Sequence, residues 1–246
     1  MKIKYSLGDI KKVSHPKTSV FDALISNPLS VRLTWVVANF TEITPNQITY
    51  LSFLAGLSSA WCFFQGTPVY LIFGVLFYIL ATVLDFMDGR MARLKKGSAL
   101  GSFLDGACDG CKWSLNIFAL CYGQFRITGQ AIFLMLGLAI SLVYFMMSSY
   151  GNIKKESQEL YIKKEQKIIN KAKSYNFLGK LKDFKNYFEK KGIYPFFTLG
   201  EATALIFIAG PVFGIIKECL IISLSFCLFM LVSHFIIIVI DLSRLR

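Results

Sequence analysis

Charged residues are scarce in this sequence, and their scarcity excludes an ordinary soluble domain. They make up 17% of the 246 residues, whereas 54% are hydrophobic, and the mean hydropathy is +0.53. Soluble domains carry about 25% charged residues on average. The polar residues gather in short tracts between long apolar runs, a pattern typical of a multi-pass membrane protein.

The sequence also lacks a second cysteine pair. Cys108 and Cys111 form a C-x-x-C pair, but a zinc or redox site needs a second pair or a thioredoxin-like context. All six cysteines fall in predicted spans, so we expect apolar thiols and no disulfide framework. A cleavable signal peptide is not expected, because the first apolar run follows a polar start.

Six apolar segments approach the length of about 20 residues that a membrane-spanning helix requires. They are residues 47–65, 69–84, 104–122, 131–150, 194–216 and 219–240. The second segment is short, but we expect its helix to continue through Arg93. The predicted fold is an all-α integral membrane protein with six transmembrane helices and an N-terminal interfacial amphipathic helix. We expect residues 1–44 to form a cytoplasmic N-terminal segment and residues 45–246 to form one six-helix membrane domain.

Basic residues are nearly missing from one side of this topology, where Arg126 and Lys217 stand alone. The positive-inside rule therefore puts both termini in the cytoplasm. The net charge of +12 is mostly a signal of topology. We do not expect nucleic-acid binding, because the basic residues are not interleaved with aromatic ones on a reading surface.

Two polar regions flank the spans. From Pro28, five apolar residues share one helical face, which predicts an interfacial helix that Thr44, Pro45 and Asn46 separate from the first span. The lysine-rich insertion, residues 151–192, is compatible with a cytoplasmic helical excursion. We interpret its lysines as a solvated face and topology signal, with attraction of anionic lipids as the alternative.

Four aspartates lie at the ends of two neighbouring apolar helices: Asp85, Asp88, Asp105 and Asp109. An ionised carboxylate at membrane depth is costly unless it is paired or metal-bound. Each pair has i,i+3 or i,i+4 spacing and shares one helix face. A short turn around residues 95–99 makes the helices antiparallel, so all four carboxylates can converge. Such a cluster favours Mg²⁺ or Mn²⁺, which prefer oxygen ligands.

The full pattern D-x2-D-G-x2-A-R-x7-G-x3-D-x3-D runs from Asp85 to Asp109. It resembles the motif of the CDP-alcohol phosphotransferases, membrane enzymes that make phospholipids. The resemblance implies that Asp85, Asp88 and Asp105 bind two divalent metal ions and that Asp109 shares one of them. It also implies that Asp109 acts as the general base towards an acceptor alcohol, which displaces CMP. The residues that would contact the nucleotide are Asn46, Asp85, Gly89, Ala92 and Arg93. A homodimer is the expected assembly.

The acceptor alcohol is less well defined. Arg90, Lys112 and Glu201 are candidate acceptor-binding residues, with a polyol phosphate among the possible acceptors. Lys112 lies three residues from Asp109, and it would serve equally well as a counter-ion of Asp109 or Asp105. We interpret His234 as a packed helix residue.

Three functions remain open at this point. The leading one is phosphatidyl transfer from CDP-diacylglycerol, or a similar CDP-linked lipid, to a small polar alcohol. The second is transfer from CDP-choline or CDP-ethanolamine to diacylglycerol. The third, from another class, is ion or proton transport. The distribution of the acids argues against transport, because they cluster at one surface and do not form a chain across the bilayer.

Overall fold

The computed structural model describes residues 4–13, 19–95, 97–165 and 199–243. Every regular element in these ranges is helical, which confirms the all-α prediction. The elements are α1 (Leu7–Lys12), η1 (Asp22–Ser26), α2 (Asn27–Phe40), α3 (Pro45–Gln65), α4 (Pro68–Lys95), α5 (Ala99–Thr128), α6 (Ile132–Glu165), α8 (Leu199–Ala204), η2 (Leu205–Ala209), α9 (Gly210–Phe213) and α10 (Ile216–Ser243). Here η1 and η2 are single π-helical turns.

Helix α3 lies between α4 and α5 and joins them through small polar side chains. Ser52 Oγ donates to the Ala81 carbonyl of α4 at 2.9 Å. Ser59 Oγ lies 2.9 Å from Gly74 O on α4 and 2.7 Å from Asn116 Oδ1 on α5. Both serines are fully buried, so these contacts satisfy groups that would otherwise destabilise a dry interface.

Helix α3 starts at Pro45, two residues before the predicted span. Thr44 Oγ1 accepts from the Gln47 amide, and Gln47 Oε1 accepts from the Thr44 amide at 2.8 Å. This reciprocal capping box satisfies two N–H groups that the helix itself leaves unpaired. Because Thr44 fixes the helix start, Pro45 and Asn46 enter the first turn of α3 beside the end of α4.

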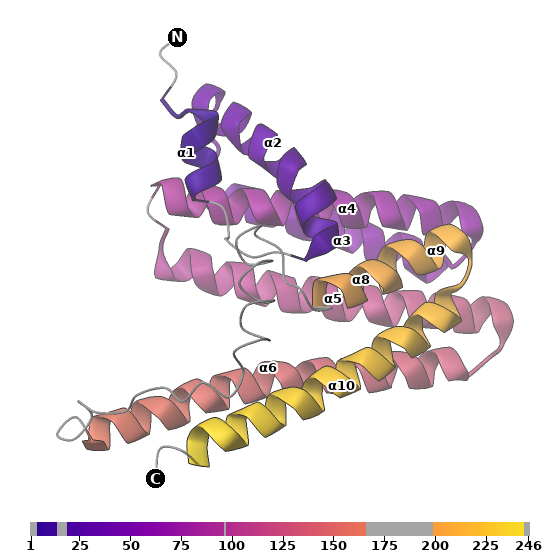
Figure 1. Ribbon diagram of the computed structural model, residues 1–246. Helices are drawn as coiled ribbons and strands as arrows, with labels where there is room; N and C mark the ends of the chain where they lie inside the picture. Colours follow the sequence, from indigo (N-terminus) through magenta and orange to yellow (C-terminus); the bar gives the residue numbers. More distant parts are fainter. Residues whose placement is uncertain (1–3, 14–18, 96, 166–198, 244–246) are drawn as a thin grey trace.

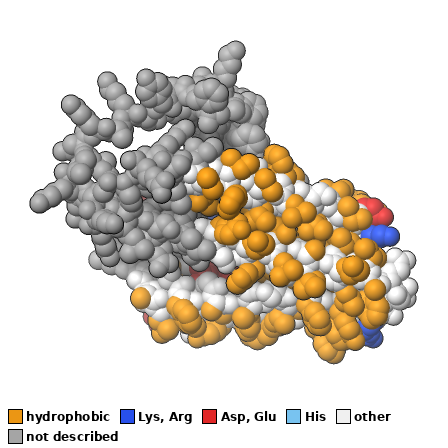
Figure 2. All heavy atoms as spheres, turned by 90° about the horizontal axis from the view of Figure 1, so that it is seen from below, with side chains coloured by type: hydrophobic (Ala, Val, Ile, Leu, Met, Phe, Trp, Pro, Cys, Tyr) orange, Lys and Arg blue, Asp and Glu red, His pale blue; other side chains and the backbone are white. Residues whose placement is uncertain are grey.

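Three described helices are long and apolar enough to cross a membrane, which indicates an integral multi-pass protein. They are Pro68–Lys95, Ile132–Tyr150 and Ile216–Ser233. Outward-facing residues such as Phe145 and Phe229 are 69% and 66% exposed. On the face seen in Figure 2, hydrophobic side chains dominate the described surface and charged ones are few.

The other predicted spans do not meet this length and composition criterion. Residues 47–65 and 104–122 lie inside α3 and α5. Polar side chains lower the hydropathy of both helices, and α5 also carries charged ones. The predicted span 194–216 is described only from Leu199, and its apolar helix runs to Phe213. That helix ends there because Gly214 is left-handed, with φ of 70°.

Helix α2 packs against α4, and α1 packs against α2 (Figure 1). Its buried face includes Ser30 and Thr34, and its exposed face includes Leu29 and Val36. The amphipathic pattern predicted for this helix is present. Its position at a membrane interface stays a prediction.

The remaining elements are α6, α8, η2, α9 and α10. Helices α6 and α10 lie side by side, and α8, η2 and α9 lie between α10 and α4 (Figure 1). Helix α6 continues through Glu165, so the first part of the lysine-rich insertion is helical. The rest of the insertion lies outside the described residues. All six cysteines are free thiols.

Candidate active site

Asp85 of α4 meets Asp105 and Asp109 of α5 at one point. One oxygen from each carboxylate lies within 4.8 Å of the others. The geometry follows from the antiparallel α4–α5 pair, whose connection spans only residues 96–98. Because Asp105 and Asp109 are one helical turn apart, both face α4. The predicted convergence is therefore present for these three aspartates.

Asp88 is one helical turn from Asp85 but lies outside this group of three, and it is more deeply buried. Its side chain is 3% exposed, and Oδ2 has no hydrogen-bond partner among the described residues. A buried carboxylate oxygen without a partner is costly, and a bound cation would offset that cost. Together with the three clustered carboxylates, this oxygen fits a divalent cation, whose preferred ligands are carboxylate oxygens. The donor set therefore suits the predicted Mg²⁺ or Mn²⁺.

Lys112 contacts two of the clustered aspartates. Its Nζ atom lies 2.7 Å from both Asp85 Oδ1 and Asp109 Oδ1. It also donates to Ser52 Oγ at 2.8 Å, so it links three helices. Its side chain is 11% exposed. The structure thus supports the counter-ion interpretation of this residue.

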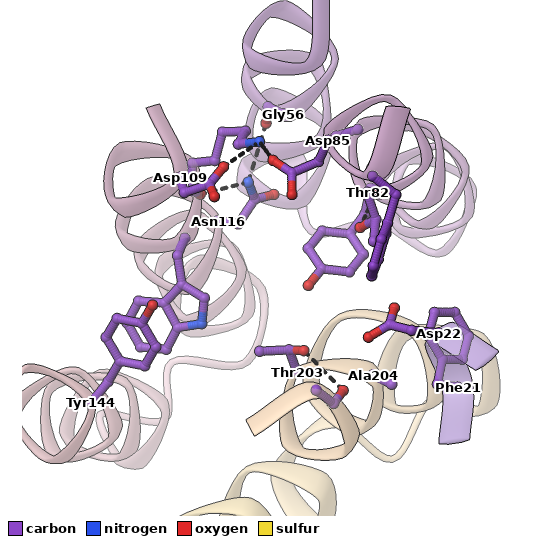
Figure 3. Close-up of a pocket in the computed structure, with 16 residues that line it drawn as sticks. Phe21, Asp22, Gly56, Thr82, Asp85, Asp109, Asn116, Tyr144, Thr203 and Ala204 are labelled. Carbon is purple, nitrogen blue, oxygen red and sulfur yellow. Dashed lines mark hydrogen bonds and ion pairs between the residues drawn. The ribbon is translucent and has the colours of Figure 1, made fainter. Parts of the chain in front are cut away.

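The four aspartates line two cavities. We call the first the Asp109 cavity, which has a volume of about 280 Å³ and is lined in part by Asp22, Tyr78, Asp85, Asp109, Lys112 and Tyr144. We call the second the Arg93 cavity, which has a volume of about 600 Å³ and is lined in part by Asn46, Asp88, Gly89, Ala92, Arg93 and Asp105. Each cavity thus receives two of the four aspartates. Figure 3 shows Asp85 and Asp109 together at one side of the Asp109 cavity.

Four of the five predicted nucleotide-binding residues line the Arg93 cavity. Asn46 comes from the first turn of α3, and Gly89, Ala92 and Arg93 come from the end of α4. The fifth, Asp85, lines the other cavity. Arg93 Nε also donates to the Val13 carbonyl at 2.6 Å, which holds its side chain against the N-terminal segment.

Two predicted acceptor-binding residues contact other parts of the protein. Arg90 is 1% exposed and donates to Ser30 Oγ at 2.6 Å and to Phe86 O at 2.9 Å. Its Nη2 also contacts Asn27, so the guanidinium joins α4 to α2. Glu201 Oε1 accepts from the Val20 amide at 2.6 Å. Neither side chain is among those that line the two cavities. His234 belongs to α10.

Sequence reasoning missed the far side of the Asp109 cavity. Asp22 comes from the N-terminal segment, Tyr144 from α6 and Thr203 from α8. These elements are distant in sequence, and no local motif connects them. Burial raises the pKa of the Asp22 carboxyl above its usual value, against hydrogen bonds from serine side chains that lower it.

The fold and site define a helical membrane protein with a carboxylate cluster between two cavities. Residues 42–178, more than half of the chain, match the family model of CDP-alcohol phosphatidyltransferases. The chain therefore belongs to this family of enzymes, which is metal-dependent and uses a CDP-alcohol donor and an alcohol acceptor.

Two archaeal relatives match part of the chain. The bifunctional IPC transferase and DIPP synthase of Thermococcus kodakarensis is 34% identical over 91 residues, which are 36% of this chain and 20% of that protein. The protein of the same name from Archaeoglobus fulgidus is 35% identical over 103 residues, which are 40% of this chain and 19% of the relative. The match thus spans about a fifth of the length of each relative.

Proposed function

We propose that this protein transfers a substituted phosphate group from a CDP-linked lipid, such as CDP-diacylglycerol, to the hydroxyl of a small polar alcohol. The products are a phospholipid and CMP. The observation that carries this proposal is the division of the four aspartates between two cavities. Oxygens of Asp85 and Asp109 in one cavity and of Asp105 in the other lie within 4.8 Å of one another, so a donor in one cavity and an acceptor in the other would react at these carboxylates.

The Arg93 cavity suits the nucleotide end of the donor. It is the larger cavity, and Arg93 supplies a positive charge that favours a pyrophosphate. Gly89 and Ala92 have small side chains, which would let the donor approach the backbone of α4 closely. Asn46 adds polar groups from the opposite helix.

Asp85, Asp88 and Asp105 would hold Mg²⁺ or Mn²⁺, expected as two ions, with Asp109 able to share one. When bound, the cations would neutralise charge on the phosphate oxygens of the donor. The unpartnered Asp88 oxygen and the three clustered carboxylates support this assignment.

The proposed general base is Asp109, which lines the acceptor side. Its side chain is 45% exposed against 32% for Asp85, so it is the more accessible of the two carboxylates that Lys112 contacts. The hydroxyl oxygen of the acceptor forms a bond to the β-phosphorus as the bond from that phosphorus to CMP breaks. The hydroxyl proton passes to Asp109, and CMP leaves through the Arg93 cavity.

The concentration of Lys and Arg on one side of the predicted topology supports an active site that faces the cytoplasm. A homodimer is the expected assembly.

The decisive assay measures CMP release by the purified full-length protein in detergent, with CDP-diacylglycerol and a panel of alcohols, with and without Mg²⁺ or Mn²⁺. A parallel arm offers CDP-choline or CDP-ethanolamine with diacylglycerol. The absence of metal-dependent CMP release with every donor would refute the proposal.

A further inference from the structure

The Asp109 cavity has a second acidic group opposite the proposed base. Asp22 lies in η1 at the N-terminal end of the fold and is half-buried. Figure 3 shows its carboxylate pointing into the cavity from the side opposite Asp85 and Asp109. Thr203 of α8 points into the same space. An acceptor with its reacting hydroxyl at Asp109 would therefore present its other end to Asp22.

The position of Asp22 is built by specific contacts. Ser19 Oγ donates to Asp22 Oδ2 at 2.6 Å and accepts from the Asp22 amide at 3.0 Å. Next to it, the Val20 amide donates to Glu201 Oε1 at 2.6 Å, which anchors the segment to α8. The packing there is tight, since a Cβ atom added at Gly200 would lie 2.5 Å from Ser19 Cβ. These contacts hold the Asp22 carboxylate at the cavity wall.

Aromatic rings form much of the rest of this wall. Trp113 and Tyr144 stack with their centroids 4.0 Å apart, and Tyr78 lines the cavity from α4. A carboxylate among such rings repels a phosphate and attracts groups that donate hydrogen bonds. Among the described residues that line this cavity, Lys112 is the one cation, and it already contacts two aspartates at 2.7 Å each. The described wall therefore disfavours an anionic acceptor.

We propose that Asp22 is a specificity-determining residue that selects an unphosphorylated alcohol whose far end donates a hydrogen bond from a hydroxyl or an ammonium group. This inference rests on the proposed function, because it assigns the acceptor of that reaction. The cavity volume of about 280 Å³ restricts the acceptor to a small molecule.

The first test uses the wild-type protein and paired acceptors that differ by one phosphate. The pairs are glycerol with glycerol 3-phosphate and inositol with inositol 1-phosphate, and ethanolamine and serine supply the ammonium arm. We expect a higher kcat/KM for the unphosphorylated member of each pair. Preference for ethanolamine or serine over the polyols would identify the ammonium as the recognised group, and the reverse order would identify the hydroxyl. A higher kcat/KM for the phosphorylated members would overturn the proposal.

The second test compares Asp22→Asn with Asp9→Asn. Asp9 makes a similar contact, from Ser6 Oγ to Asp9 Oδ2 at 2.7 Å, but it lies outside both cavities. Asp22→Asn should raise the KM of the preferred acceptor about tenfold, the order expected for a lost hydrogen bond to a charged group. The KM of the CDP donor should not change, and Asp9→Asn should leave both constants at wild-type values. An unchanged acceptor KM in active Asp22→Asn protein would overturn the proposal.

Failure of the proposed function would look different. In that case the wild-type protein would release no CMP with any acceptor. If Asp22→Asn protein does not fold, as judged by its thermal unfolding with CDP and Mg²⁺, the acceptor pairs with wild-type protein still decide the question.

Discussion

The Nζ atom of Lys112 lies 2.7 Å from Oδ1 of Asp109, three residues earlier on α5. The same ammonium lies equally close to Asp85 on α4. It therefore offsets the charge of two carboxylates that the helices bring together, one of which is the proposed base. This arrangement favours a role for Lys112 as a counter-ion. Its alternative role, as a ligand of the acceptor, can be tested by substitution.

Replacing Lys112 with Met should destabilise the metal-free protein. Two clustered carboxylates would lose their counter-ion, at a cost of about 2 kcal/mol because both keep partial exposure. Mg²⁺ should then raise the thermal unfolding midpoint more than it does in wild-type protein. Arg126→Met, in the last turn of α5, is the matched control and should not change the response to Mg²⁺. A normal midpoint but a raised acceptor KM would favour the acceptor-ligand role instead.

Asp109→Asn should retain donor and metal binding but lose turnover. Removal of a general base lowers kcat by about 10²- to 10⁴-fold. CMP release measures the loss, and the shift of the unfolding midpoint by CDP with Mg²⁺ measures binding. Full activity of this variant would exclude Asp109 as the base.

Asp88→Asn should weaken metal binding without lowering the stability of the metal-free protein. The buried Asp88 carboxylate has an oxygen without a partner among the described residues, and a neutral amide there removes a buried charge. The metal-free variant should unfold at or above the wild-type midpoint, while the stabilisation by Mg²⁺ is lost. An unfolding midpoint that still rises with Mg²⁺ as in wild-type protein would remove Asp88 from the ligand set.

The aspartate cluster could be predicted because its geometry is local. Asp85 and Asp109 lie on consecutive helices joined by a short connection, and helical spacing determines which faces they share. The break at Thr44 between α2 and α3 is equally local and was predicted from adjacent residues. The same holds for the continuation of α4 through Arg93.

Contacts between distant segments could not be predicted in this way. Arg90 bonds to Ser30, 60 positions away, and Glu201 bonds to Val20, 181 positions away. Helix periodicity indicates that a polar side chain needs a partner, but it does not identify the partner. Asp22 was missed for the same reason, because its cavity exists only after the N-terminal segment packs on α8.

Gly101→Ala should weaken binding of the CDP donor. An added Cβ would lie 2.9 Å from Asn46 Oδ1 and 3.2 Å from Ser98 Oγ, so Asn46 must shift within the Arg93 cavity. We expect the KM of the donor to rise about tenfold, as for the loss of a polar contact. Gly106→Ala on the same helix is the control, because nothing lies within 4 Å of its added Cβ. Equal donor KM values in the two variants would contradict the role of Asn46.

Asp22→Asn should also change how stability depends on pH. Burial raises the pKa of Asp22 in the folded protein, and the neighbouring Glu201 carboxylate raises it further, whereas Ser19 opposes the shift. The folded state then binds more protons than the unfolded state, so the contribution of Asp22 to stability falls as pH rises from its unfolded pKa of about 3.8 through its folded pKa. Asparagine does not ionise, so the Asp22→Asn variant does not lose stability in this way as pH rises. Its unfolding midpoint should therefore exceed that of the wild type at neutral pH, with the difference shrinking towards pH 4. A midpoint difference that is constant with pH would show that Asp22 is not buried as a costly carboxylate, whereas the expected trend would mean that the protein retains this acid at the expense of stability.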